Sequence, residues 1–326
     1  MSQVCYFEQR EECSGHEMIK SLLIRVAKMY YEQNMTQQEI SNLLGTSRMA
    51  ISRMLQKAKE EGVVDIKVNY DGAFIEMEDN LKEKYKLKEI LVTPFDQGER
   101  LKQVLAEATA SILMRILKDN DIVGVGWGST LAYIPQYMER GKVDATFVTL
   151  IGGYGQKKIE MHGSYIASSM ANSLNSKCHL LNAPAMVDSL ELCETLLTDK
   201  NISSVLAIGR KANIAVIGIG APFSPESTIF DSGYFKTKDI DELRKEGAEC
   251  DIVSRVYLDG QGNECGFALT NRTIGITAAE LKRIPLVIGV AGGEAKHRAI
   301  KLALQAGYVN GLVTDEKTAK FLLGLA

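Results

Sequence analysis

The amino-acid sequence predicts a two-part α/β fold, in which a winged helix-turn-helix precedes a doubly wound, mostly parallel α/β domain. Two observations support this prediction. Three amphipathic helical patterns lie close together before Gly62, and from Glu89 on short apolar runs ending in glycine alternate with helical stretches. The 326 residues leave room for two or three domains. We expect a variable segment over residues 1–16, a helix-turn-helix over 17–70, a linker or dimerisation helix over 71–88 and the α/β domain over 89–326.

Composition and charge restrict the class of protein. The formal net charge is −3, so any binding of nucleic acid must rest on a local basic face. The N-terminus lacks the pattern of a secretory signal, and no apolar run is long enough to span a bilayer. The six cysteines form no C-x-x-C pair, and the four histidines lack the spacing of metal ligands. We therefore expect a cytoplasmic protein with reduced thiols and with no metal or other cofactor.

The first two helical patterns lie between residues 18 and 45. Apolar residues recur with helical period along Met18–Tyr30. They are Met18, Leu22, Val26 and Tyr30, with Leu23, Ala27 and Tyr31 alongside. Thr36 and Glu39 have the spacing of a capping box, in which each side chain bonds the amide of the other residue. Gly45 then ends the second helix, because glycine tolerates a left-handed C-cap. The buried face predicted for this helix consists of Ile40, Leu43 and Leu44.

A third helix with a basic face follows this tight turn. Either Thr46 or Ser47 can cap it, and it runs to Gly62 with a buried stripe formed by Ile51, Met54, Leu55 and Ala58. Two short helices joined by a glycine turn are typical of a helix-turn-helix. Between residues 46 and 59 the chain carries no acidic residue and four basic ones, namely Arg48, Arg53, Lys57 and Lys59.

This basic helix predicts binding in the major groove of DNA. The residues predicted to contact DNA are Gln37, Ser47, Arg48, Ser52, Arg53 and Lys57. Arg48 and Arg53 can reach base edges or phosphates, whereas the others contact the phosphate backbone. Met49 either touches a thymine methyl group or packs within the helical domain. The alternative for the whole helix is a solvated charged surface.

The segment after Gly62 predicts a short strand over Val63–Val68, as in a wing, and a turn at residues 69–72. Ile75–Tyr85 then predicts a charged amphipathic helix. This helix either links the domains and contacts a second copy of the chain, or is a simple surface helix.

Strands and helices alternate through the rest of the chain. Glu89–Thr93 predicts a strand and Glu99–Leu117 a long helix, and Thr314–Leu323 predicts a closing helix. Four apolar strands that end in glycine begin at Asp121, Ala145, Ala212 and Leu286. Continuous apolar runs are typical of parallel strands buried on both faces.

Glycines at the ends of these strands predict a ligand site at one edge of the sheet. A glycine after a strand lets a ligand approach backbone amides, and the next helix start adds partial positive charge. Neither a G-x-G-x-x-G nor a Walker A sequence occurs, which disfavours dinucleotides and nucleoside triphosphates. A phosphate group fits better, and the residues predicted to surround it are Gly126, Gly128, Ser129, Thr130, Gly152, Gly153 and Gly293.

Lys296 and Asp251 complete the predicted site. Lys296 stands in the first helical turn after Gly293, where the helix dipole opposes a cation and a bound anion would relieve the opposition. The alternative for Lys296 is a salt bridge with an acid such as Glu294. Asp251, at the start of a predicted strand, can accept hydrogen bonds from sugar hydroxyl groups, and Trp127 either lines the crevice or packs in the core. We expect Arg255 and Arg272 in structural ion pairs, and His297 and Arg298 on the surface.

Three stretches of the chain resemble the SorC family of sugar-metabolism regulators. They are YYEQNMTQQEISNLLGTSRMAISRMLQKAKEEG, VGVGWGSTL and VAGGEAKHRAIKLALQAGYVNGLVTDEKTA. The resemblance covers nearly all of the chain and implies a winged helix-turn-helix fused to an effector domain related to sugar-phosphate isomerases. It also implies a homo-oligomer, commonly a tetramer, that binds palindromic operators and responds to a phosphorylated sugar or polyol.

The resemblance also assigns residues. Those that match effector positions are Gly128, Ser129, Thr130, Gly152, Gly153, Asp251 and Lys296, and those that match the recognition helix are Ser47, Arg48, Ser52 and Arg53. Two positions depart from the family pattern. Ile151 precedes the Gly152–Gly153 pair, so no lysine there can form a Schiff base and the resemblance implies noncovalent binding. Cys250 stands where many relatives carry glycine, so the resemblance does not fix the backbone conformation at Asp251.

The sequence thus predicts a DNA-binding transcription regulator of a carbohydrate-utilisation operon, whose operator affinity is controlled by a noncovalently bound phosphorylated sugar or polyol. One alternative is a sugar-phosphate isomerase with a DNA-binding appendage. Asp251 could then act as the general base, but the sequence shows no second titratable group with a complementary role. The other alternative is a DNA-bound scaffold that has no effector.

Overall fold

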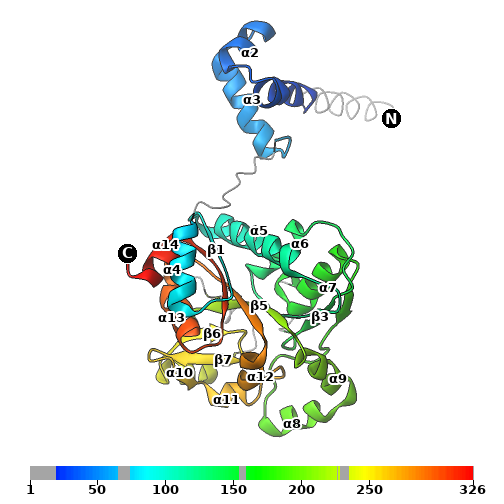
Figure 1. Cartoon of the computed structure of the whole chain (residues 1–326), viewed down its shortest axis with the longest axis vertical. Coiled ribbons are helices and arrows are strands. Elements are labelled where there is room, and N and C mark those ends of the chain that lie inside the picture. The colour runs from blue at the N-terminus through cyan, green and yellow to red at the C-terminus, as the bar shows by residue number, and fades with distance from the viewer. Residues whose placement is uncertain (1–19, 65–73, 154–158, 226, 228–234, 326) are drawn as a thin grey trace, which may run out of the picture. The chain divides into compact units, whose positions relative to one another are not determined.

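A computed structural model describes residues 20–64, 74–153, 159–225, 227 and 235–325 of the chain. The chain divides into two compact units, residues 1–69 and residues 70–326. Figure 1 shows the first unit as helical and the second as an α/β structure. The finer division at residues 16, 70 and 88 stays a prediction.

Within residues 20–64, the first unit consists of three helical segments. Residues 20–27 are α-helical and continue into the π-helical turn η1 (Lys28–Glu32), and α2 (Gln37–Leu44) and α3 (Arg48–Glu60) follow. The apolar side chains buried between these helices include Leu23, Val26, Met29, Ile40, Ile51 and Leu55.

The ends of α2 and α3 form as the local sequence predicts. Thr36 Oγ1 accepts a hydrogen bond from the Glu39 amide at 3.3 Å, and Glu39 Oε2 accepts one from the Thr36 amide at 2.8 Å, which confirms the capping box. Gly45 ends α2 with a φ of 62°. Of the two candidate caps of α3, Ser47 is the one in use, because its hydroxyl accepts a hydrogen bond from the Ala50 amide at 3.1 Å.

The predicted buried face of this domain is wrong at two positions. Leu22 and Leu43 are exposed, whereas Leu23 and Ser41 are buried. Periodicity indicates the width of an apolar face, but the helices that pack against it decide which of two neighbouring residues points inward.

The strand predicted after Gly62 does not begin at Val63. The amides of Val63 and Val64 both donate to the Ala58 carbonyl, at 2.8 and 3.1 Å, and so continue the end of α3. The remainder of the predicted wing and the turn at residues 69–72 lie outside the described residues.

The second unit is built on one sheet, and the described chain shows a parallel array in the order β1-β10-β9-β5-β2-β3-β4. Its strands are β1 (Glu89–Thr93), β2 (Ile122–Val125), β3 (Thr146–Thr149), β4 (Lys177–His179), β5 (Ile214–Gly220), β9 (Leu286–Val290) and β10 (Gly311–Asp315). An antiparallel extension pairs with β5 and consists of β6 (Ala248–Ile252), β7 (Val256–Asp259) and β8 (Glu264–Cys265).

Helices cover both faces of this sheet (Figure 1). The helical elements are α4 (Ile75–Tyr85), α5 (Gly98–Ile116), η2 (Leu131–Tyr133), α6 (Ile134–Tyr137), η3 (Ile159–Met161), α7 (Gly163–Ser173), α8 (Leu190–Thr198), α9 (Lys200–Gly209), α10 (Thr237–Lys245), α11 (Phe267–Thr270), α12 (Ala278–Arg283), η5 (Glu294–Lys296), α13 (His297–Gln305) and α14 (Glu316–Leu323). None of the helices described has the length and apolar character needed to cross a membrane.

The two faces of β5 show why the sheet is covered on both sides. Ala215, Ile217 and Ile219 belong to one buried cluster, together with residues of α4, α13 and α14. Ile214 and Val216 belong to a second cluster, together with residues of α5, α6 and α7. Since successive side chains of a strand point to opposite faces, this alternation confirms the doubly wound fold.

The predicted linker helix packs on the second unit. It is α4, with the predicted bounds. Leu81 is fully buried, and Glu78 Oε1 accepts a hydrogen bond from the Val92 amide at 2.7 Å. Its contact with a second copy of the chain stays a prediction.

Asp251 occupies a different place in its strand from the one predicted. It lies near the end of β6 rather than at the start of a strand, because Val253 and Ser254 have left-handed φ values of 58° and 51° and turn the chain into β7. Neither residue favours that conformation, so the sequence carries no turn signal there. The closing helix likewise begins at Glu316 and not at Thr314, since the preceding residues complete β10.

Candidate ligand cavity and DNA-binding face

A cavity of about 90 Å³ lies at the carboxyl ends of β2, β5 and β9. These ends meet at one edge of the parallel sheet, where ligands of open α/β folds bind. The lining residues are Lys102, Trp127, Gly128, Ser129, Thr130, Leu131, Gly218, Ile219, Gly220, Ala221, Pro222, Ser224, Ser227, Asp251, Val253, Val290 and Lys296.

Asp251 provides the cavity with a buried carboxyl group. Its Oδ1 accepts a hydrogen bond from the Ser254 amide at 2.6 Å, and its Oδ2 accepts one from Ser254 Oγ at 3.2 Å. Burial raises the pKa of Asp251 to about 7, although the Ser254 hydrogen bonds and the charge of Lys296 act in the opposite direction. The remaining lone pairs of the carboxyl group can accept hydrogen bonds from hydroxyl groups of a ligand.

Two lysines bring positive charge to the lining. Lys296 is half-buried at the end of η5, directly before α13. The alternative partner Glu294 forms its ion pair with Lys317, at 3.2 Å. Lys102, on α5, pairs with Glu99 at 2.7 Å, which offsets part of its charge.

The turn after β2 and the chain after β5 offer further polar groups. Gly128 has a φ of 135°, which favours glycine, and its amide donates to the Met161 carbonyl at 3.0 Å. Within the described ranges the amides of Ser129 and Thr130 donate to no protein acceptor. The hydroxyl of Ser224 is buried without a hydrogen-bond partner among the residues described. A polar ligand in this cavity would satisfy such groups.

In the first unit, α3 presents a basic face to solvent. Arg48, Ser52 and Arg53 are exposed, whereas Ile51 on the opposite side is fully buried. Met49 is 65% exposed, so the alternative in which it packs within the domain is wrong.

A groove of about 820 Å³ lies beside the first turns of α2 and α3. Its lining residues are Tyr30, Tyr31, Asn34, Met35, Thr36, Gln37, Gln38 and Arg48. The structure therefore brings together Gln37 and Arg48, two of the residues predicted to contact DNA. Lys57 lies toward the other end of α3 and pairs with Glu61 at 3.5 Å, and the Ser47 hydroxyl caps α3.

Comparison with known proteins identifies this pair of domains. The family described as "Putative sugar-binding domain" matches residues 72–324, and the "Crp-like helix-turn-helix domain" matches residues 19–83. The chain is 31% identical to the sorbitol operon regulator of Klebsiella pneumoniae over 311 residues, which cover 93% of this chain and 97% of that protein. The chain belongs to the SorC family.

Two further comparisons agree with this assignment. The crystal structure of the full-length sorbitol operon regulator SorC from Klebsiella pneumoniae matches with a TM-score of 0.74 at 29% identity, over 93% of this chain and 98% of that one. The deoxyribonucleoside regulator of Bacillus subtilis is 32% identical over 308 residues, which cover 93% and 97% of the two chains.

These comparisons confirm the general class of function predicted from the sequence. The SorC-family protein is a sugar-responsive transcription regulator, with DNA and a sugar effector as its partners. These comparisons favour the regulator over the isomerase alternative, and the sugar-binding domain disfavours the alternative without an effector.

Only some of the residues predicted for the effector site line the cavity of this SorC-family regulator. The predicted residues that line it are Gly128, Ser129, Thr130, Asp251 and Lys296. Those outside the lining are Gly126, Gly152, Gly153 and Gly293. In this structure the amides of these four glycines are not free to bind an anion, since they donate to Val216, Ile274, Ala183 and Asp315, respectively.

Gly152 shows what such a glycine does instead. A Cβ atom at this position would lie 2.5 Å from the Ala183 carbonyl oxygen, so its absence permits two backbone segments to pack closely. A role of these glycines in ligand binding stays a prediction.

The lining residues that the sequence interpretation missed are Lys102, Leu131, Ser224, Ser227, Val253, Val290 and the segment 218–222. The segment 218–222 contains the glycine-rich end of β5, a strand that the sequence predicted. The argument that placed Gly126 and Gly128 in the site could therefore have been applied to Gly218 and Gly220 as well. Lys102 lies within a long helix, and no local pattern distinguishes it. Trp127 lines the cavity and also packs against buried apolar residues, so both alternatives hold.

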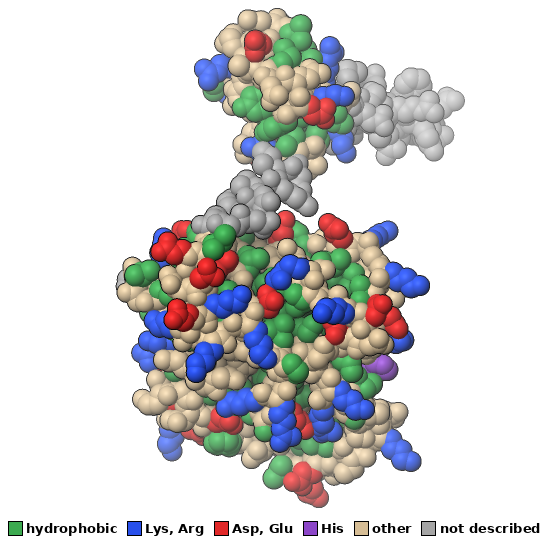
Figure 2. Space-filling view, viewed as in Figure 1, with side chains coloured by type: hydrophobic (Ala, Val, Ile, Leu, Met, Phe, Trp, Pro, Cys, Tyr) green, Lys and Arg blue, Asp and Glu red, His purple; other side chains and the backbone are tan. Residues whose placement is uncertain are grey.

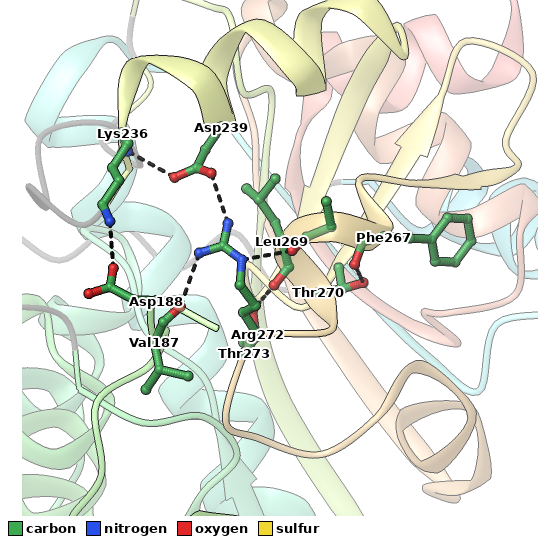
Figure 3. A network of polar contacts seen from close by, with 10 residues as sticks. Val187, Asp188, Lys236, Asp239, Phe267, Leu269, Thr270, Arg272 and Thr273 are labelled. Carbon is green, nitrogen blue, oxygen red and sulfur yellow. Dashed lines mark hydrogen bonds and ion pairs between the residues drawn. The ribbon is translucent and has the colours of Figure 1, made fainter. Parts of the chain in front are cut away.

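A polar network holds α10, the helix that follows the cavity-lining residues Ser224 and Ser227 in the chain (Figure 3). Arg272 Nη2 donates to Asp239 Oδ1 at 2.8 Å, and both side chains are largely buried. Lys236 Nζ pairs with Asp188 at 2.6 Å, and its hydrogen bond lowers the pKa of Asp188. The ion pair predicted for Arg272 is confirmed.

The other charged residues of this region have mixed outcomes. Arg298 is exposed and pairs with Glu249 at 2.6 Å, and Arg255 donates to the Thr270 and Ile276 carbonyls. His297 is not a surface residue as predicted, because its Nε2 is buried and its ring stacks on a residue of α14.

Proposed function

We propose that this regulator binds a phosphorylated sugar or polyol noncovalently in the cavity of Asp251 and Lys296, and that the bound ligand changes its affinity for a palindromic operator. We also propose that it acts as a homo-oligomer, commonly a tetramer in this family. The observation that carries the proposal is that a cation and a buried carboxyl group line one cavity at the carboxyl edge of a parallel sheet.

The polar groups of the cavity suit two different parts of such a ligand. Lys296 and the amides of Ser129 and Thr130 are donors, which suit the acceptor-only oxygens of a phosphate. Asp251 and Ser224 can accept hydrogen bonds, which suits hydroxyl groups.

Noncovalent binding is supported by position 151. Ile151 is buried, pairs with Gly275 in an isolated β-bridge and does not line the cavity. No amine is available there for a Schiff base with an aldehyde.

The size of the cavity supports a linked change in shape. At about 90 Å³ it is smaller than the roughly 300–1,000 Å³ typical of small-molecule sites, so ligand entry has to displace lining groups. A ligand that favours the opened arrangement shifts the protein toward it, and a coupling of about 1–3 kcal/mol changes operator affinity by about 5–150-fold.

Replacement of Lys296 by methionine tests the effector site. Loss of a charge-assisted hydrogen bond of about 1.5–3 kcal/mol should weaken binding of the effector by about 10- to 150-fold, while operator binding without effector is retained. Calorimetry with ribose 5-phosphate, fructose 6-phosphate and glucitol 6-phosphate would measure the binding.

Lys301→Met is the matched control, because Lys301 is exposed on α13 beyond Lys296. Equal affinities of the Lys296→Met variant and the control would remove Lys296 from the site. Binding of the unphosphorylated sugars with the same affinity would refute the proposal that the cavity binds a phosphate group.

Replacement of Arg48 and Arg53 by alanine tests the DNA-binding face. Each lost contact should weaken operator binding by about 1–3 kcal/mol, and a lost phosphate contact should also reduce the salt dependence. Gln56→Ala, on an exposed position of the same helix, is the control. Unchanged gel shifts for the arginine variants would exclude α3 as the DNA-reading helix.

A further inference from the structure

The segment that presents Lys296 to the cavity is joined to α14 at three described points. The Gly293 amide donates to Asp315 Oδ2 at 2.8 Å, and Asp315 is the N-cap of α14. Glu294 pairs with Lys317 at 3.2 Å. The third point involves the residue that directly follows Lys296.

That residue, His297, stacks its ring on Phe321. The ring centroids are 4.6 Å apart and the planes differ by 24°. Burial lowers the pKa of His297, which favours the neutral form of the ring in this stack. Because His297 directly follows Lys296, a movement of Lys296 also moves the His297 ring, which is packed against Phe321 of α14.

The opposite end of α14 is bonded to α4. The carbonyl of Leu322 lies in the last turn of α14, where helical carbonyls lack intrahelical partners. It accepts hydrogen bonds from Lys84 Nζ at 2.8 Å and from Tyr85 Oη at 3.2 Å. A cation at this end of a helix is also favoured by the helix dipole. These bonds fix the C-terminus of α14 to α4.

The hydrogen bonds between α14 and α4 matter for regulation because of the position of α4 in the chain. It is the first helix described after the DNA-binding domain, and the two are joined through residues 65–73. Figure 1 shows α4 and α14 side by side on the second unit, in agreement with the two hydrogen bonds. Any shift of α14 relative to the sheet is thus passed to the helix from which the chain leads to the DNA-binding domain.

We propose that α14 couples the effector cavity to α4, with the His297–Phe321 stack and the bonds of Lys84 and Tyr85 to Leu322 as its two contacts. The four side chains are positioning residues, since none of them lines the cavity. This role rests on the proposed function, because it needs a ligand that reaches Lys296.

The test uses the full-length chain with Lys84→Met and Tyr85→Phe combined, which removes both donors and keeps similar side-chain volume. Operator affinity is measured by fluorescence anisotropy with and without the tightest-binding of the three sugar phosphates named above. We expect the variant to keep its affinity for the operator alone and for the sugar phosphate alone. A typical coupling changes operator affinity by about 5- to 150-fold, and we expect this ligand-induced change to be at least about five-fold smaller in the variant.

Lys82→Met, at an exposed position of α4, is the matched control and should retain the full response. Phe321→Leu, which removes the stack and leaves an apolar side chain, should lower the response in the same way and guards against misfolding of the double variant. A full response in both test variants, or an equal loss in the control, would overturn the coupling role while leaving the ligand site intact. A wild-type chain that binds none of the three sugar phosphates would refute the ligand class and the coupling role together.

Discussion

Replacement of Asp251 by asparagine should change the pH dependence of stability. The carboxyl group is 7% exposed and receives two hydrogen bonds from Ser254. An amide has nearly the same shape, can still accept the bond from the Ser254 amide, and does not titrate. The substitution therefore removes a buried titrating group with little change in packing.

The sign and the size of the effect follow from the pKa. Burial raises the pKa of Asp251 to about 7 in the folded chain, from 3.8 for the free group. The folded state binds the proton more tightly, so this group favours folding below pH 3.8, and the stabilisation is lost as pH rises to about 7. At about 1.36 kcal/mol for each pH unit, the stability of Asp251→Asn relative to wild type should increase by about 4 kcal/mol between pH 4 and pH 8.

Urea unfolding at constant ionic strength would measure this difference. Trp127 is the sole tryptophan of the chain and lines the same cavity, so its fluorescence reports on the second unit. Asp241→Asn, at an exposed position of α10, is the control and should show no such trend. A difference between wild type and Asp251→Asn that stays constant across the pH range would refute the reasoning, since it would show that the carboxyl group is not buried.

Two further substitutions test the contacts that hold each unit. Arg272→Met leaves Asp239, 2% exposed in its side chain, without its ion-pair partner and should destabilise the second unit by about 3–5 kcal/mol; a combined Arg272→Met and Asp239→Leu variant should regain much of this in the same urea assay. Equal stabilities of the single and combined variants would contradict the pair. Thr36→Ala removes the N-cap of α2 and should cost the first unit about 1 kcal/mol, measured by thermal unfolding followed through the helical circular-dichroism signal. Thr46→Ala is the control because Ser47 and not Thr46 caps α3, and equal losses would count against the observed caps.

The sequence by itself determined the local elements and the family. The capping box at Thr36, the left-handed end at Gly45 and the bounds of α4 and β1 were predictable, because each depends on hydrogen bonds and side-chain patterns within a few residues. The mostly parallel character of the sheet in the large domain followed from apolar runs that end in glycine, since strands buried on both faces leave that pattern.

The tertiary structure alone decided which of the predicted residues meet in one cavity. Asp251 and Lys296 line it together, because strands far apart in the sequence end at the same edge of the sheet. Lys102 joins them from a helix whose own pattern shows only an apolar stripe.

Two glycines that were predicted to bind the ligand also show what the sequence could not decide. Gly152 and Gly293 have the residue type for anion binding, but their amides are already bonded to Ile274 and Asp315. The physical reason is that a residue's type and neighbours set what its backbone can do locally. Which acceptor takes its hydrogen bond, and which ring stacks on His297, depends on segments brought together only by packing of the core.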